Sequence, residues 1–157
     1  MLSVKPKISS STGLLALLVI LTTVSCGTIN PLKQNQEELD VKIKAFNFEF
    51  ESKALDRSSR FIHPEFMEAF QKNSVDFKKK VTILESDRLD LKFFMDDKPV
   101  TITPSLFEED FNRAELKVRY QLSILPSTKI KTIIVKQEWV RHKSFWYVLP
   151  NLDSFLN

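Results

Sequence analysis

Few side chains in this sequence have the type and spacing that catalysis requires. A general base needs a carboxylate or an imidazole within hydrogen-bond reach of the proton that it takes. The candidates are Asp40, Asp56, Asp90 and His63. No spacing directs these side chains toward one common point. We therefore expect Asp56 to cap a helix, Asp90 to point outward from a strand and His63 to lie in a turn.

Motifs for metals, nucleophiles and phosphates are also missing from the sequence. His63 and His142 are its two histidines, and no pair of His or Cys residues has the short spacing that zinc sites use. A Gly-x-Ser-x-Gly elbow does not occur. The two glycines, Gly13 and Gly27, both precede the expected domain, which excludes glycine-rich phosphate loops. The sequence therefore predicts no metal, no cofactor and no enzymatic activity.

The N-terminal segment indicates chemistry of another kind, namely processing and lipid attachment. An apolar stretch from Leu14 to Val24 follows Lys5 and Lys7 and stops just before Cys26, the only cysteine. Basic, apolar and small residues in this order are typical of a secretory signal peptide. The apolar stretch is too short to span a bilayer, which needs about 20 residues.

The cysteine at the end of this segment makes it resemble the signal of bacterial lipoproteins, although Thr23 stands where that family usually has Leu. The resemblance implies cleavage before Cys26 and fatty acids on its thiol and on its new amino group. Residues 1–25 would then be the signal peptide, and residues 26–36 a lipidated tether. Gly27 takes the place of the Asp that retains many such proteins at the inner membrane, which implies the outer membrane. The membrane is thus one expected partner.

Charge gives no reason to expect nucleic acid as a partner. Without residues 1–25 the chain has 132 residues, with 21 Lys and Arg against 20 Asp and Glu. Such a balanced chain lacks the basic excess that phosphate binding uses. Its length is typical of one domain, which we place at residues 37–157.

The pattern from Glu37 to Asp56 is ambiguous. Apolar residues at helical spacing occupy one face, but the alternation of Phe46, Phe48 and Phe50 also fits a strand. We favour a helix because no breaker interrupts the segment. The residues of the helical face are Leu39, Ile43, Phe46, Phe50 and Ala54.

The rest of the chain predicts helices followed by strands, an α+β order. A short helix should follow Asp56, and Pro64 should open a third helix over residues 65–72. Alternating apolar residues predict antiparallel strands after it. We expect a loop over 96–112 and strands over 81–93, 114–124, 130–141 and 145–149.

Two segments resemble the nuclear transport factor two-like family: Arg60–Phe66, and the pairing of Gln137–Arg141 with Trp146–Val148. The resemblance implies N-terminal helices on a curved antiparallel sheet that forms a cone. Some members hold a pocket there, and enzymes of this type, such as ketosteroid isomerases and polyketide cyclases, use an Asp or His inside it. The family also dimerises through an exposed sheet face. Lys143-Ser144 replaces the usual Asp-Gly or Asn-Gly, so we expect a different turn. Cystatin-like α+β folds have the same element order and remain an alternative.

Aromatic residues allow two interpretations. They could line an apolar pocket, or they could fill the core between helices and sheet, which we favour. The candidates for pocket lining are Phe46, Phe50, Phe61, Phe66, Phe70, Phe93, Trp139 and Trp146.

We therefore expect a lipid-anchored envelope lipoprotein, on the periplasmic side or the cell surface, that acts as a non-enzymatic binding or accessory module. One alternative is a carrier or a small isomerase-like or cyclase-like enzyme for an apolar ligand. Another is a surface lipoprotein that contacts host or matrix proteins. The partner itself is either a protein or an apolar ligand, and the sequence does not identify it.

Overall fold

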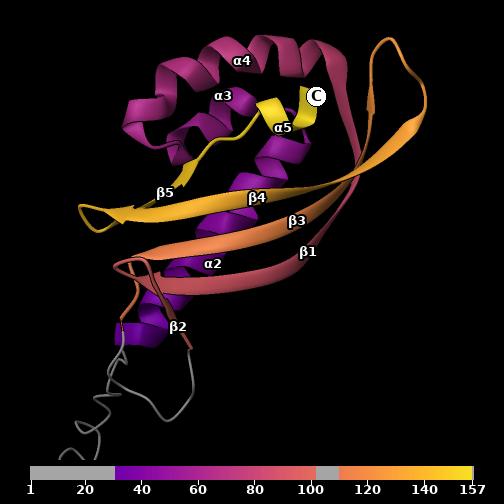
Figure 1. Ribbon diagram of the computed structural model, residues 1–157. Helices are drawn as coiled ribbons and strands as arrows, with labels where there is room; N and C mark the ends of the chain where they lie inside the picture. The colour runs from indigo at the N-terminus through magenta and orange to yellow at the C-terminus, as the bar shows by residue number, and fades with distance from the viewer. Residues whose placement is uncertain (1–30, 102–109, 157) are drawn as a thin grey trace, which may run out of the picture. The chain divides into compact units, whose positions relative to one another are not determined.

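A computed structural model describes residues 31–101 and 110–156, and Cys26, the signal peptide and the first part of the tether lie outside these ranges. The described residues form a five-stranded antiparallel sheet with helices packed on one side (Figure 1). This confirms the α+β class with helices on an antiparallel sheet. Among the described helices, none is long and apolar enough to cross a membrane.

The helices precede the sheet, as the sequence predicts. Helix α2 (Pro31–Glu51) is followed by the short α3 (Leu55–Ser58) and two 3-10 turns, η1 (Ser59–Phe61) and η2 (Pro64–Phe66). Helix α4 (Met67–Lys80) then leads directly into the first strand, and it is longer than the predicted helix over 65–72.

The strands follow in the order β2-β1-β3-β4-β5 across the sheet. They are β1 (Val81–Met95), β2 (Lys98–Val100), β3 (Arg113–Ile124), β4 (Ile130–His142) and β5 (Phe145–Leu149), and the four-residue helix α5 (Asp153–Leu156) follows. Strand β2 lies within the segment predicted to be a loop. Strand β1 has register shifts between Ile83 and Glu85 and between Arg88 and Asp90. These bulges bend the strand without any glycine.

Helix α2 lies along the inner face of the sheet (Figure 1). The predicted helical face is confirmed, because Leu39, Ile43, Phe46 and Phe50 are all buried. The prediction of a tether over residues 26–36 is wrong for residues 31–36, because α2 begins at Pro31. Asn35 at the beginning of α2 is buried, and hydrogen bonds satisfy its side-chain amide. The amide donates to the carbonyl oxygen of Phe111 (3.0 Å) and accepts from the indole N–H of Trp146 (3.0 Å). Both partners lie far along the chain, so no local pattern predicts this start.

The end of α2 shows how the chain turns without glycine. Lys53 has a φ of 59°, and the backbone N–H groups of Lys53 and Ala54 donate to the carbonyl oxygens of Phe50 and Glu49. This is the Schellman pattern, which glycine usually completes. The predicted cap at Asp56 is wrong: Ala54 precedes α3, and its side chain makes no capping hydrogen bond.

Two hairpin turns use the same left-handed conformation. Asp96 and Asp97 connect β1 to β2, and Lys143 and Ser144 connect β4 to β5, each with positive φ. Positive φ at both central residues is the signature of the type I′ turn, which Asn-Gly favours. The expectation of a different turn at Lys143-Ser144 is therefore wrong, because non-glycine residues adopt the usual geometry here.

Replacing Ser144 with glycine should stabilise the protein. Its φ is 68°, a conformation that costs a non-glycine residue about 1–2 kcal/mol. Part of the gain is lost to the greater freedom of glycine in the unfolded chain. Urea unfolding should show a free energy of unfolding higher by about 0.5–1 kcal/mol. The control Lys72→Gly, within α4, should lower it by about 1 kcal/mol instead. A Ser144→Gly variant no more stable than the parent would contradict this account of the turn.

Candidate functional site

Three polar side chains meet inside the domain, between α2 and the inner face of the sheet. The amide nitrogen of Gln137 on β4 donates to Asn47 Oδ1 on α2 (2.7 Å) and to the hydroxyl of Tyr120 on β3 (2.9 Å). The Tyr120 hydroxyl in turn lies 3.5 Å from Asn47 Oδ1. All three side chains are buried. We call Asn47, Tyr120 and Gln137 the polar centre.

The polar centre is uncharged near neutral pH. Burial raises the pKa of Tyr120, and the negative charge of Glu51 raises it further, whereas the hydrogen bond from Gln137 acts weakly in the opposite direction. Asn47 and Gln137 do not titrate. The centre therefore holds no group that is ionised near neutral pH.

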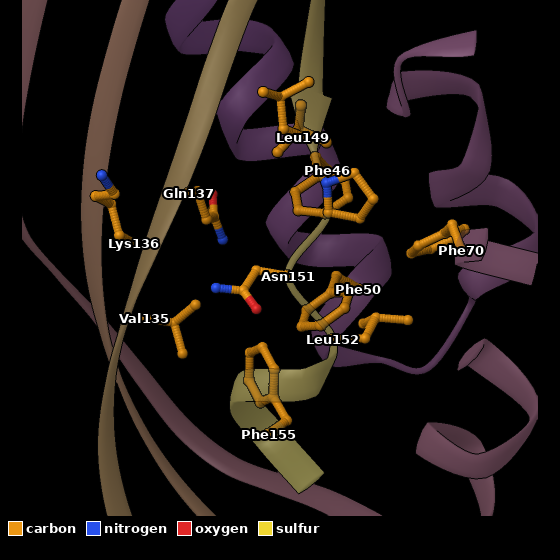
Figure 2. Close-up of a pocket in the computed structure, with 12 residues that line it drawn as sticks. Phe46, Phe50, Phe70, Val135, Lys136, Gln137, Leu149, Asn151, Leu152 and Phe155 are labelled. Carbon is orange, nitrogen blue, oxygen red and sulfur yellow. The ribbon is translucent and has the colours of Figure 1, made fainter. Parts of the chain in front are cut away.

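A small cavity lies beside the polar centre (Figure 2). Its volume is about 20 Å³, which is room for about one water molecule. Gln137 contributes to its wall, and Gln137 Oε1 accepts no hydrogen bond from the described residues. Phe46, Phe50 and Phe70 also line it. Among the described residues of its lining, none is Asp, Glu or His.

The C-terminal segment makes the cavity this small. Leu152 and Phe155 are buried and line it from the side opposite β4 (Figure 2). The ring of Phe155 lies 5.0 Å from that of Tyr120, 5.4 Å from that of Phe50 and 5.3 Å from that of Phe77, between centroids. The side chains of Leu152 and Phe155 thus fill part of the space between α2 and β4.

The other aromatic candidates lie away from this cavity. Trp139 is fully buried with its ring 5.7 Å from that of Phe46, and Phe61 packs against the same ring. Trp146 and Phe93 both contact Phe111. Phe66 is partly exposed at the beginning of α4.

The candidate bases lie on the surface, in ion pairs. Asp40 pairs with Lys44 and Arg88, Asp56 with Lys78, and Asp90 with Lys92. Hydrogen bonds from Lys44 and then Arg88 outweigh partial burial and lower the pKa of Asp40. Each of these carboxylates has a structural partner, and none of them lines the cavity.

The two histidines lie side by side, which the sequence did not suggest. His63 follows η1 and pairs with the edge of β5, since its backbone N–H donates to the carbonyl oxygen of Val148. Its ring centroid is 5.5 Å from that of His142 and 5.7 Å from that of Tyr147. In the part of the chain that the structure describes, no group of three or more metal-binding side chains occurs.

A larger, open hollow lies on the helix-covered side of the sheet, between α2 and β1, and Asn47 and Val118 contribute to its lining. Its volume is about 330 Å³. Glu51 and Ser86 bridge the two elements with a hydrogen bond of 2.6 Å, and Asp40 and Arg88 bridge them with an ion pair. Phe48 stands at this hollow with 76% of its surface exposed.

Sequence reasoning missed the polar centre, although two of its members leave a trace. Gln137 interrupts the inward row of Val135 and Trp139, and Tyr120 belongs to the inward row of β3. A polar side chain in an inward row needs a partner, so the alternation contains the signal. Asn47 has no comparable signal, because its burial depends on where α2 crosses the sheet.

Comparison with protein-family models, with curated proteins and with solved structures finds no match to this chain. A function for this chain therefore rests on the arrangement of its described residues and on its sequence.

Proposed function

We propose that this chain is a lipid-anchored module of the bacterial cell envelope that binds a protein partner on its outer surface and catalyses no reaction. One observation carries the proposal: between α2, β4 and the C-terminal segment the interior is filled, and the cavity left there measures about 20 Å³. A drug-sized ligand needs about 300 Å³ or more. The nuclear transport factor two-like cone, which the element order suggests, would here be closed by the protein's own C-terminal segment.

The chemistry of the interior supports the same proposal. The polar centre consists of two amides and a protonated phenol, which can position a helix but do not exchange protons at neutral pH. Phe48 on α2, in contrast, has an exposed ring beside an open hollow of about 330 Å³ between α2 and β1. Exposed aromatic rings are common anchors at protein interfaces.

The lipid anchor would hold the domain close to the membrane. Because α2 begins at Pro31, only four residues, 27–30, separate it from Cys26, and the five steps along the chain reach about 18 Å at most. We propose an outer-membrane location on the basis of Gly27.

The lipid anchor is tested with Cys26→Ala, which removes the thiol that would carry the fatty acid. We expect loss of radiolabelled palmitate from the protein and its release from the membrane fraction, because one noncovalent domain surface holds a bilayer far more weakly than several acyl chains. Ser25→Ala, which keeps a small residue before the cysteine, serves as the control and should label normally. Palmitate labelling that survives in Cys26→Ala would refute the anchor.

A binding assay with apolar probes separates the proposed external binding surface from the alternative, an internal site for an apolar ligand. The full-length protein, purified in detergent and exchanged to a low-detergent buffer, is titrated with 1-anilinonaphthalene-8-sulfonate and then with cis-parinaric acid. We expect no saturable binding to the parent chain. Phe155→Ala, which removes one ring from the interior and enlarges the cavity, should bind at least one of the probes and so shows that the assay detects it. Saturable one-to-one binding by the parent chain would favour the carrier alternative.

A further inference from the structure

Strand β4 has an open edge near its beginning. It pairs with β3 from Ile130 onward, but β5 covers only its later part, Glu138–His142. Within the described residues no strand lies on the other side of Ile130–Ile134. Figure 1 shows this end of β4 extending with the β3–β4 hairpin beyond the helices. An open edge presents unpaired backbone N–H and C=O groups to any strand that approaches.

The side chains of this edge are apolar where the neighbouring strand is polar. Ile130 and Ile134 are each 63% exposed on the outer face of the sheet, next to Ser123 and Arg119 of β3. Thr132 lies between them on the same face. A β-branched, apolar edge of this kind favours pairing with another strand.

We propose that two copies of this chain pair through this edge as antiparallel strands, with Thr132 opposite Thr132 of the second copy. The two sheets would then form one continuous sheet with a two-fold axis through the Thr132 pair. The proposal does not depend on the lipid anchor or on the interior being closed.

Symmetry selects this register. A two-fold axis perpendicular to the sheet keeps outward side chains opposite outward side chains, so the axis must pass through a residue and not between two residues. With the axis at Thr132, each exposed Ile130 lies opposite Ile134 of the other copy. Both exposed isoleucines are covered at once, as cross-strand apolar pairs require.

The lysines of the segment agree with the same register. With the axis at Thr132, Lys131 lies opposite Ile133 and Lys136 opposite Thr128, so no two lysines lie directly opposite each other. Moving the axis to residue 131 would place Lys131 opposite itself, and like charges directly opposite are unfavourable. Moving it to residue 133 would place Ile130 opposite Lys136 and leave the isoleucines apart.

The flat face of the sheet is less suited to self-association than its edge. Its outward side chains already form ion pairs within the chain, among them Arg119 with Asp87 and Arg113 with Glu138. Lys136 reaches both Glu115 and Glu138. A partner on this face would have to displace or cover paired charges, which is costly.

Disulfide trapping tests the register directly. Directly opposite residues of antiparallel strands have Cα atoms about 4.5–5.5 Å apart, within the range for a disulfide. In the full-length protein, mild oxidation of Thr132→Cys should give a covalent dimer. The unsubstituted chain gives the background from Cys26, and Ser127→Cys, exposed in the same hairpin, gives the background from random collisions. Dimer at Thr132→Cys no stronger than in these two controls would overturn the proposal.

A charge exchange tests the same pairing without a cross-link. Ile130→Glu and Ile134→Lys should each raise the dimer dissociation constant about tenfold, measured by sedimentation velocity, because each places a charge opposite an isoleucine at two symmetric positions. The combined variant places Glu opposite Lys at both positions and should return to within about threefold of the parent. Val75→Glu, at an exposed position of α4, should leave this dissociation constant unchanged. A monomeric parent chain, or a combined variant weaker than both single ones, would refute this register.

Discussion

The position of helix α2 on the sheet depends on two buried asparagines. Asn35 joins the beginning of the helix to β5 through the Trp146 indole, and Asn47 joins its middle to Gln137 on β4. Apolar packing alone would allow the helix to slide or rotate, because rings and branched chains can pack in several ways. A buried amide has partners in one position only, and leaving it without them costs about 1–3 kcal/mol. The polar centre is therefore best understood as the feature that fixes the register of helix and sheet.

This arrangement determines what the inside of the domain can do. Once α2 is fixed, Phe46 and Phe50 fill the space above β4, and Phe155 returns from the end of the chain to close it. The remaining volume holds about one water molecule. The polar centre beside this volume consists of the protonated Tyr120 hydroxyl and the side-chain amides of Asn47 and Gln137. Under the proposed function, recognition takes place on exposed surface, where Phe48 and the open edge of β4 are apolar.

The parts that sequence predicts well are those with local periodicity. Alternation from Ala114 to Leu122 predicts β3 because one face of that strand is buried along its whole length. The beginning of α2 was missed because Asn35 is buried only by partners more than 70 residues away. The cap at Asp56 was wrong because Lys53 had already turned the chain, in a conformation that glycine usually takes. The C-terminal segment offers three apolar residues as signal, Leu152, Phe155 and Leu156, which are too few to show a period.

The most direct test of this account is a double-mutant cycle between Asn47 and Gln137, measured by urea unfolding. Asn47→Leu and Gln137→Leu each leave a buried amide without its partner, so each should lower the free energy of unfolding by about 1–3 kcal/mol. The double variant should lose less than the sum, with a coupling energy of about 1–2 kcal/mol. Additive losses, or single losses below about 0.5 kcal/mol, would contradict the claim that this contact fixes α2 on the sheet.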